Sequence, residues 1–228
     1  MTHNIIVLPI EQLENFSEDA IADLTYVVNE GYRKQIVKYG IVVNPRIHDN
    51  DSFFTDLSLK PKTCLVYIMI KDVQDVGGPL RIIDTEENAD FILYEINETY
   101  IKDYRFHMEN VMATIAYRPF PYEVNAQAYE VTAFCSFTKR GGIYIFQGTK
   151  PDFIKRFPNC NEFIVRVIVE HDLVPYYETK LNFTEFRRTH VSCDKLEESG
   201  FFSSFKTNQD FHIADMRQQL LLAPPRSQ

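Results

Sequence analysis

Two apolar runs constrain the fold more than any other feature of the sequence. Residues 64–70 (CLVYIMI) and 162–170 (EFIVRVIVE) are rich in β-branched and aromatic side chains, which is typical of strands buried on both faces. Such strands need other elements packed on each side of their sheet. Further strands are predicted at residues 4–10, 110–117, 129–134, 183–190 and 211–216, and a strand or an insertion is predicted at residues 91–95. The sequence therefore predicts a large sheet that helices cover on both faces.

One amphipathic segment, between Ser17 and Gly40, predicts the first helix. Its apolar residues recur at helical spacing, Ser17 is a suitable N-cap, and Gly40 is a suitable stop. A helix over residues 143–157 would be interrupted at Gly148 and Pro151, because proline removes a backbone donor. Short helices are also predicted over residues 51–57 and 175–181. Strands follow one another in the middle of the chain and alternate with helices later, which predicts an α/β chain with a mixed sheet.

Length and charge limit the classes of function. The chain has 228 residues, of which 45% are hydrophobic, so it can build a core, and one enlarged domain over residues 1–228 is the default expectation. The net charge of −8 and the pI of about 5.3 disfavour binding to nucleic acid, because an acidic surface repels phosphate backbones. The same charge weakly favours a cationic substrate such as an amine.

The cysteines and histidines do not predict a metal site. The four cysteines include no CxxC pair, and neither they nor the six histidines show the spacing of a zinc site. Free thiols in a reducing compartment are the simplest interpretation. The sequence shows no signal peptide, and no apolar run approaches the roughly 18–20 residues of a membrane span. We therefore expect no metal, no membrane contact and a cytoplasmic location, with the nucleus left open.

A basic turn after a predicted strand is the first candidate binding site. Lys139, Arg140, Gly141 and Gly142 stand between the strand at residues 129–134 and a predicted helix. Backbone N–H groups at the start of a helix attract anions, glycines let the backbone approach a phosphate, and the two cations add charge-assisted contacts. The turn matches neither a Walker loop nor a GxGxxG motif. An ordinary tight turn with solvated charges is the alternative interpretation.

Two phenols are the second candidate. Residues 171–183 (HDLVPYYETKLNF) predict the end of a strand and then a short helix that presents Tyr176 and Tyr177. A phenol in this position could donate a proton or form a hydrogen bond to a sulfur atom. The alternative is that both rings are half-buried packing residues.

These two segments, in this order, resemble the cofactor motifs of the GNAT superfamily of N-acetyltransferases. Phe134 stands where the family has a valine, and Ser136 stands where it has a proline. Lys139 and Gly142 match the family's Arg or Gln and its first glycine, whereas Tyr144 replaces a small residue. The frame of the first motif is therefore kept, with one departure at its end.

The family's second motif is a helix that ends in Tyr, followed by Lys-Leu-Gly-Phe. This chain has YETKLNF from Tyr177 to Phe183, with one extra residue and with Asn182 in place of the glycine. The resemblance is firm over residues 110–190. It implies a mixed, mostly antiparallel central sheet with helices on both faces, in one GNAT-like acyltransferase domain with an insertion around residues 72–108.

The resemblance also implies where acetyl-CoA would bind. In the family, the pantetheine arm enters a splay between two neighbouring strands, which here would be those at residues 129–134 and 162–170. Backbone groups of Phe134, Cys135 and Ser136 would face the arm, and an N–H near Phe134 would polarise the thioester carbonyl. The pyrophosphate would lie on the amides of Lys139, Arg140, Gly141, Gly142, Ile143 and Tyr144. A crowding side chain at Tyr144 would weaken this binding.

The implied reaction is direct attack of an amine on the thioester. Tyr177 would donate to the sulfur and Glu130 would be the general base, unless Glu130 is only a solvated carboxylate at a strand edge. A covalent mechanism through Cys135 is disfavoured, because no histidine is linked to it by spacing. The alternative is a degenerate GNAT fold that binds CoA or a partner protein without turnover. The acceptor amine and the choice between monomer and homodimer stay open.

Overall fold

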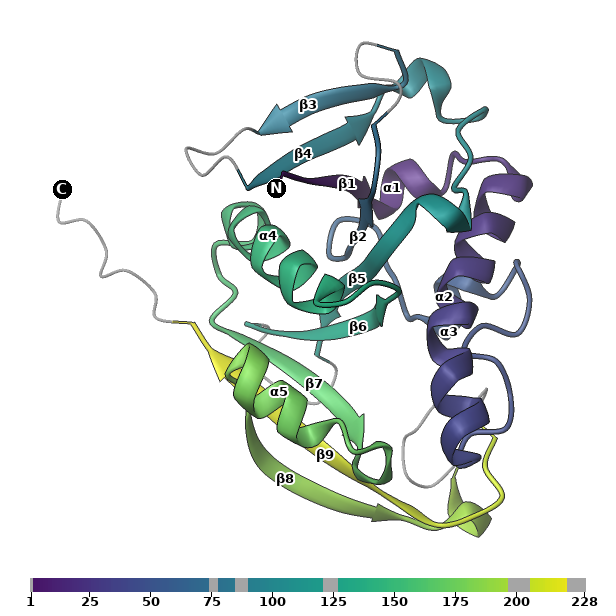
Figure 1. Cartoon of the computed structure of the whole chain (residues 1–228), viewed down its shortest axis with the longest axis vertical. Coiled ribbons are helices and arrows are strands. Elements are labelled where there is room, and N and C mark those ends of the chain that lie inside the picture. The colour runs from purple at the N-terminus through teal and green to yellow at the C-terminus, as the bar shows by residue number, and fades with distance from the viewer. Residues whose placement is uncertain (1, 74–77, 85–89, 121–126, 197–205, 221–228) are drawn as a thin grey trace, which may run out of the picture.

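The computed structural model describes residues 2–73, 78–84, 90–120, 127–196 and 206–220. Within these residues nine strands form one sheet in the order β3-β4-β1-β2-β5-β6-β7-β9-β8 (Figure 1). The strands are β1 (His3–Pro9), β2 (Leu65–Ile70), β3 (Leu80–Asp84), β4 (Phe91–Ile96), β5 (Val111–Pro119), β6 (Ala128–Ser136), β7 (Glu162–Ile168), β8 (Thr184–Val191) and β9 (Phe211–Gln219). Neighbours are antiparallel except for the pairs β1–β4 and β6–β7. The predicted mixed, mostly antiparallel sheet is confirmed.

Helices cover both faces of this sheet (Figure 1). The α-helices are α1 (Ile10–Leu13), α2 (Glu18–Tyr39), α3 (Phe53–Asp56), α4 (Gly141–Arg156) and α5 (Val174–Leu181), and the 3-10 turns are η1 (Glu98–Tyr100), η2 (Met108–Asn110), η3 (Val169–His171) and η4 (Cys193–Lys195). Because side chains alternate along a strand, β1 serves two cores. Ile6 and Leu8 belong to the core under α2, whereas Ile5 and Val7 belong to the core under α4 and α5.

The first long helix begins and ends as its sequence predicts. The Ser17 Oγ accepts a hydrogen bond from the N–H of Ala20 at 3.2 Å, which caps α2. Gly40 follows the last turn with a φ of 64°, a left-handed conformation that glycine adopts without strain. These two caps fix the ends of α2, which also forms one wall of the candidate site described below.

The helix α4 is unbroken, so the predicted interruption at Gly148 and Pro151 is wrong. Gly148 lies where α4 packs closely on the sheet, since a Cβ there would lie 2.5 Å from Cδ1 of Phe91. Pro151 is exposed, so the carbonyl that loses its helical partner can be hydrated. The next residue, Asp152, accepts a buried hydrogen bond from the Tyr67 hydroxyl at 2.8 Å. Tertiary contacts therefore hold the helix on both sides of the proline.

Residues 91–95, predicted as a strand or an insertion, form most of β4. This strand pairs in parallel with β1, and β3 pairs with β4 at the edge of the sheet. The helix α1 and the strand β3 were not expected from the sequence.

Candidate functional site

The strands β6 and β7 start as neighbours and then separate. Their first three residues are in register, from the pair of Ala128 and Glu162 onward, although both strands continue for several residues. On its other side β6 makes a β-bulge against β5, and Ala133 in this bulge has a left-handed φ of 45°. A bulge bends its strand, which explains why β6 leaves β7. Residues 131–136 and 165–168 thus bound an open gap, and the predicted splay is present.

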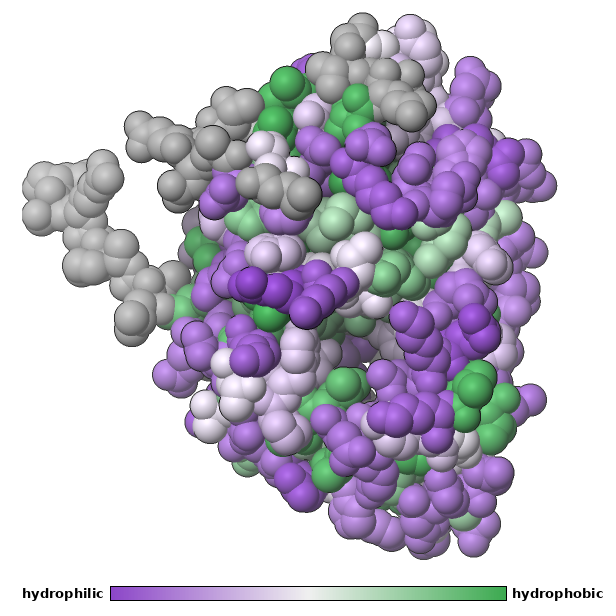
Figure 2. Space-filling view, viewed as in Figure 1, coloured by the Kyte–Doolittle hydropathy of each residue, from purple (hydrophilic) through white to green (hydrophobic). Residues whose placement is uncertain are grey.

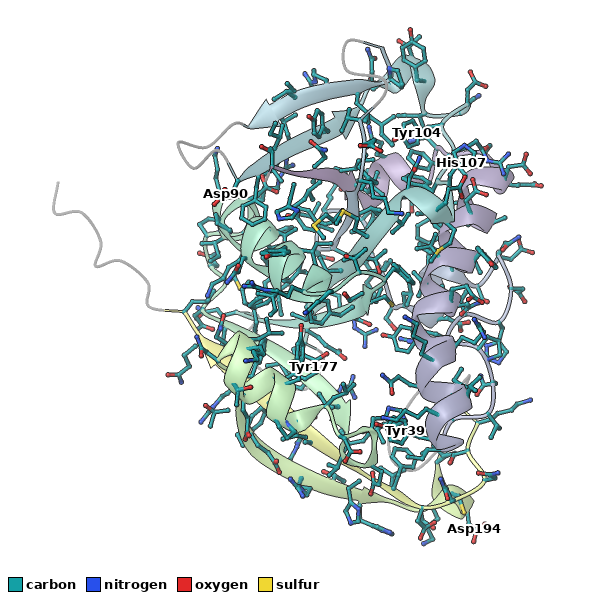
Figure 3. All side chains as sticks on the ribbon, in the orientation of Figure 1. Tyr39, Asp90, Tyr104, His107, Tyr177 and Asp194 are labelled. Carbon is teal, nitrogen blue, oxygen red and sulfur yellow. The ribbon has the colours of Figure 1, made fainter. Side chains whose placement is uncertain are left out.

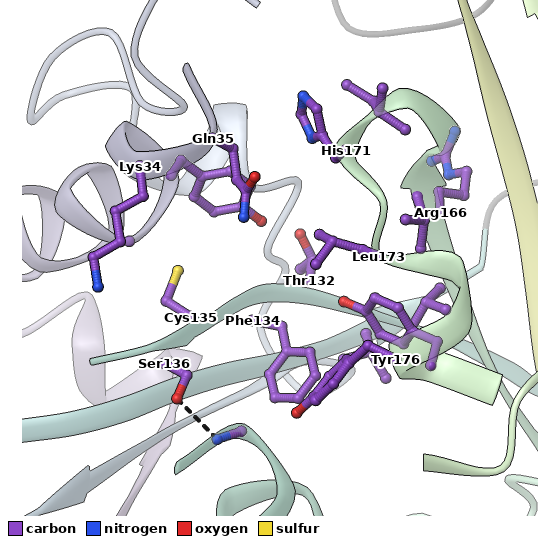
Figure 4. A pocket seen from close by; sticks show the side chains of 18 of the residues that line it. Lys34, Gln35, Thr132, Phe134, Cys135, Ser136, Arg166, His171, Leu173 and Tyr176 are labelled. Atoms are coloured by element: carbon purple, nitrogen blue, oxygen red, sulfur yellow. Dashed lines mark hydrogen bonds between the residues drawn. The ribbon is translucent and has the colours of Figure 1, made fainter. Parts of the chain in front are cut away.

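A cavity of about 560 Å³ lies along this gap (Figure 4). Residues of β6, β7, α2, α5 and the start of α4 line it, and the surface is hollowed between α5 and α2 (Figure 2). The helix α2 can approach β6 closely because Gly31 carries no side chain. A Cβ on Gly31 would overlap the side chain of Cys135.

Six of the nine predicted cofactor-binding residues line the cavity: Phe134, Cys135, Ser136, Arg140, Gly142 and Ile143. The other three, Lys139, Gly141 and Tyr144, are outside its lining. The Tyr144 ring stacks on His3 of β1, with centroids 4.4 Å apart and 26° between the planes. Tyr144 is therefore directed away from the gap. What these residues bind stays a prediction.

The N–H groups at the start of α4 have partners within the chain. The Gly142 N–H donates to Ser136 Oγ at 3.1 Å, as the dashed line in Figure 4 marks. The N–H groups of Gly141, Ile143 and Tyr144 donate to carbonyl oxygens of the preceding turn. Ser136 is exposed, so a ligand can reach this position. Its hydroxyl takes the place that an anion would occupy at the start of α4.

The side chain of Glu130 is buried between two arginines, so the alternative of a solvated strand-edge carboxylate is wrong. Glu130 Oε2 accepts hydrogen bonds from Arg118 Nη2 at 2.8 Å and from Arg166 Nη2 at 3.1 Å. Burial opposes ionisation of Glu130, but the two guanidinium groups outweigh it and lower the pKa of this carboxyl. Both oxygens of this carboxylate already accept hydrogen bonds from arginines, so they are poorly placed to take a proton from an amine. The general-base role stays a prediction, and this geometry gives it little support.

Both tyrosines of α5 line the cavity, and they have different neighbours there. Tyr177 is labelled in Figure 3 and Tyr176 in Figure 4. The hydroxyl of Tyr176 lies against the start of α4, since a Cβ on Gly142 would be 2.8 Å from it. The ring of Tyr177 packs edge-on against Phe134, with centroids 6.1 Å apart. Burial, followed by the nearby phenol of Tyr32, raises the pKa of Tyr177. Its hydroxyl therefore stays protonated, as a proton donor requires.

The Cys135 thiol is buried in the wall of the cavity. Burial raises the pKa of Cys135 to about 12, so the nucleophilic thiolate is scarce at neutral pH. This agrees with the expectation that a covalent cysteine mechanism is disfavoured.

The sequence did not single out two polar residues that line the cavity, Gln35 and His171. Gln35 Oε1 and His171 Nε2 are buried and have no hydrogen-bond partner within the described part of the chain. Burial lowers the pKa of His171 to about 4, although the nearby Glu170 and Asp172 oppose this shift. The position of His171 directly after the strand at residues 162–170 was the one available signal, because strand ends often carry functional side chains.

The charged residues that line the cavity are mostly basic. Five are Lys34, Arg46, Arg140, Arg166 and Lys180, and Glu130 is the acidic one. The local charge is thus opposite in sign to the net charge of the whole chain, −8. The weak expectation of a cationic substrate, drawn from net charge alone, does not fit this lining.

The described residues offer neither a metal site nor a membrane-spanning helix. Among residues 2–73, 78–84, 90–120, 127–196 and 206–220, no group of three His, Cys, Asp or Glu side chains could hold a metal ion. The helices of the described chain are all too short or too polar to cross a membrane.

Comparisons with known proteins place these features in context. The family model of the sporulation protein RMD6 matches residues 1–220. The sporulation protein RMD6 of Saccharomyces cerevisiae is 31% identical over 225 residues, which is 95% of each chain. In fold, a probable acetyltransferase from Staphylococcus epidermidis superposes with a TM-score of 0.50 at 8% identity, covering 96% of this chain and 99% of that one. NAA60 of Arabidopsis thaliana, in complex with a bisubstrate analogue, gives 0.48 at 11% identity, with 96% and 99% covered.

Proposed function

Since this chain belongs to the sporulation protein RMD6 family and has the fold of the GNAT acetyltransferases, we propose that it is an N-acetyltransferase that uses acetyl-CoA. The proposal takes residues 1–228 as one GNAT-like domain, with the insertion around residues 72–108. The acceptor is an amine.

The observation that carries the proposal is the gap between β6 and β7. Residues 131–136 of β6 lie beside a cavity and not beside β7, so their backbone can pair with an extended ligand in the manner of an added strand. The pantetheine arm of acetyl-CoA is extended and carries two amide groups, which suits such an edge. The cavity also runs past the start of α4, where Arg140 would meet a pyrophosphate.

The basic lining supports an anionic cosubstrate. Five Lys or Arg side chains and a single carboxylate line a cavity in an otherwise acidic protein. Clefts lined by one sign of charge concentrate ligands of the opposite sign. The backbone amides at the start of α4 fit an anionic cosubstrate less well, because they already have hydrogen-bond partners. A phosphate there would have to replace Ser136 Oγ as the partner of the Gly142 N–H.

In the proposed reaction an acetyl group moves from sulfur to the nitrogen of the amine. The new C–N bond forms as the C–S bond breaks, the nitrogen loses a proton, and the sulfur gains one. Tyr177 would supply the proton to sulfur, because its phenol is protonated and lines the cavity beside Phe134. A backbone N–H of β6 near Phe134 would stabilise the carbonyl oxygen.

Calorimetry with acetyl-CoA tests the proposal, with Ser136→Asp as the informative variant. Aspartate keeps an acceptor oxygen for the Gly142 N–H, and its negative charge suits the start of α4, so the variant should keep its melting temperature. Its charge should nevertheless weaken acetyl-CoA binding by roughly tenfold, since it would lie against the pyrophosphate. Gln147→Asp adds the same charge to an exposed position of α4 and should leave the affinity unchanged. If the unaltered protein binds no acetyl-CoA, the proposal fails.

A second candidate function is binding of CoA or of a partner protein without turnover. The internal bonds of the α4 amides and the ion pairs of Glu130 favour it, because both occupy groups that a working enzyme would direct at its substrates. Release of free thiol from acetyl-CoA over a panel of amines separates the two. Tight binding with no thiol released from any amine would leave the binding function.

A further inference from the structure

Two buried hydrogen-bonding atoms in the cavity wall have no partner among the described residues. They are Gln35 Oε1 and His171 Nε2, and the whole His171 residue is only 8% exposed. Buried polar atoms are almost always satisfied in folded proteins, and exceptions mark sites where a ligand or water is expected. Both residues line the cavity of the β6–β7 gap. The same region of the cavity therefore offers two places for a hydrogen-bonding ligand.

The fold brings these two atoms to one wall. Gly31, Gln35 and Tyr39 follow one another at intervals of four residues on α2, so they share one face of that helix. Gly31 lies against Cys135 of β6, and the ring of Tyr39 stacks on His171 with centroids 4.9 Å apart. Gln35 thus lies one helical turn from the residue that supports the imidazole.

This wall is remote from the proposed pyrophosphate site. In Figure 4, Gln35 and His171 project into the cavity on one side, whereas Ser136 lies near the start of α4 on the other, with Phe134 and Thr132 between them. An arm that enters past Ser136 and follows β6 would therefore present its far end toward Gln35 and His171.

Resting on the proposed function, we infer that Gln35 and His171 form the acceptor site, where Gln35 Oε1 holds the amine and His171 Nε2 takes its proton. The amide oxygen accepts hydrogen bonds and cannot donate them, so it suits an N–H group. The imidazole is neutral at pH 7 and can accept a proton. Attack on the carbonyl carbon makes the amine nitrogen much more acidic, so a weak base suffices. His171 is better suited to this than Glu130, whose oxygens already accept from Arg118 and Arg166.

The basic lining narrows the class of acceptor. Lys34 and Arg46 line the cavity on the side of α2 and of the segment that follows it. Positive charges there repel a second positive charge on the ligand. The site therefore takes an amine whose remaining groups are neutral or anionic, such as an amino acid, in preference to a polyamine.

The test compares His171→Phe and Gln35→Leu with the unaltered protein. Phenylalanine keeps the stack on Tyr39, so the fold should survive, and acetyl-CoA affinity in calorimetry should be unchanged for both variants. His171→Phe should lower kcat by roughly a hundredfold and remove the inflection that the imidazole gives the pH–rate profile near its pKa of about 4. Gln35→Leu should raise the KM of the amine by roughly tenfold while changing kcat less. His107→Phe and Gln147→Leu, both at exposed positions outside the cavity lining, are the matched controls.

The outcomes separate this inference from the proposed function. If the unaltered protein does not bind acetyl-CoA, both fall. If it binds acetyl-CoA but His171→Phe turns over as fast as the unaltered protein, the inference alone is overturned. A second readout needs no turnover: in the presence of CoA, glycine or glutamate should shift the imidazole nitrogen signals of His171 in ¹⁵N NMR, and spermidine should not. Signals that move with none of these amines, or with spermidine alone, overturn the inference.

Discussion

Burial decides what each side chain near the gap can do. Tyr177 keeps its proton, His171 loses its charge, and Cys135 remains a thiol, because each is removed from water. The turn motif in the sequence located Ser136 and Gly142 at the cavity, since a strand followed by a basic turn is a local pattern. The position of His171 at the cavity could not be predicted in the same way, because its burial depends on Tyr39 of α2, which is far away in the sequence.

Replacing Tyr177 with phenylalanine should lower turnover much more than cofactor affinity. The phenol would donate to sulfur only as the C–S bond breaks, so its loss should cost roughly a hundredfold in kcat. Single-turnover kinetics and calorimetry with acetyl-CoA measure the two effects separately. Tyr26→Phe, at an exposed position of α2, is the control. Equal turnover in both variants would remove Tyr177 from the mechanism.

Replacing Glu130 with glutamine should mainly destabilise the fold. Removing one partner of a buried ion pair costs roughly 3–5 kcal/mol, whereas Glu185→Gln, in an exposed pair with Arg188, should cost less than about 1 kcal/mol.

The effect of Glu130 on stability should depend on pH in a definite direction. The folded state lowers the pKa of this carboxyl below the usual 4.5, so its contribution is complete above that value. It should disappear as the pH falls through the lower, folded-state pKa, and the two proteins should then converge. Urea unfolding at pH 7 and at pH 3 measures this, and a constant difference would contradict the ion-pair explanation.

At the scale of elements, local patterns predicted most helices and strands but not their packing. The ends of α2 follow from Ser17 and Gly40, whose effects act within a few residues. The continuity of α4 was mispredicted because Gly148 serves a contact with Phe91, which is distant in sequence. The order of strands in the sheet, including the parallel pairing of β1 with β4, depends on long-range contacts in the same way.

The close approach of α2 to β6 should depend on Gly31. Alanine there would overlap the Cβ and Sγ of Cys135, so Gly31→Ala should destabilise the protein by about 1–3 kcal/mol. Cys135→Gly removes both atoms, so the double variant should recover part of that loss. A double-mutant cycle measured by urea unfolding gives the coupling free energy. Strictly additive effects would show that the two residues do not press on each other.

At the scale of the whole molecule, the pairing between β6 and β7 is the weakest junction in the sheet. The three residue pairs in register there compare with seven between β7 and β9, so fewer backbone bonds hold the strands β7, β9 and β8 to the rest. A ligand that pairs along the gap would therefore join two parts of the sheet as well as occupy a cavity.

Hydrogen exchange should reveal this joining. Acetyl-CoA should slow amide exchange at residues 131–136 and 165–168. A ligand that pairs along the gap would protect the backbone N–H groups that face the cavity and would hold the two strands together. Amides in the β1–β2 ladder, which is paired along its length, should exchange at the same rate with and without ligand. Exchange followed by mass spectrometry measures both regions. Protection elsewhere, with none at the gap, would place the ligand in another part of the molecule.

The stack of Tyr144 on His3 has a practical consequence for anyone who produces this protein. It ties the opening turn of α4 to the first strand, so material fused ahead of that strand would emerge beside the residues proposed to hold the pyrophosphate. A polyhistidine tag at that end would bring extra imidazoles into the neighbourhood, and its charge would vary with buffer. Titrations performed on such a fusion would report the tag together with the native surface, so cleavage of the tag before measurement is advisable.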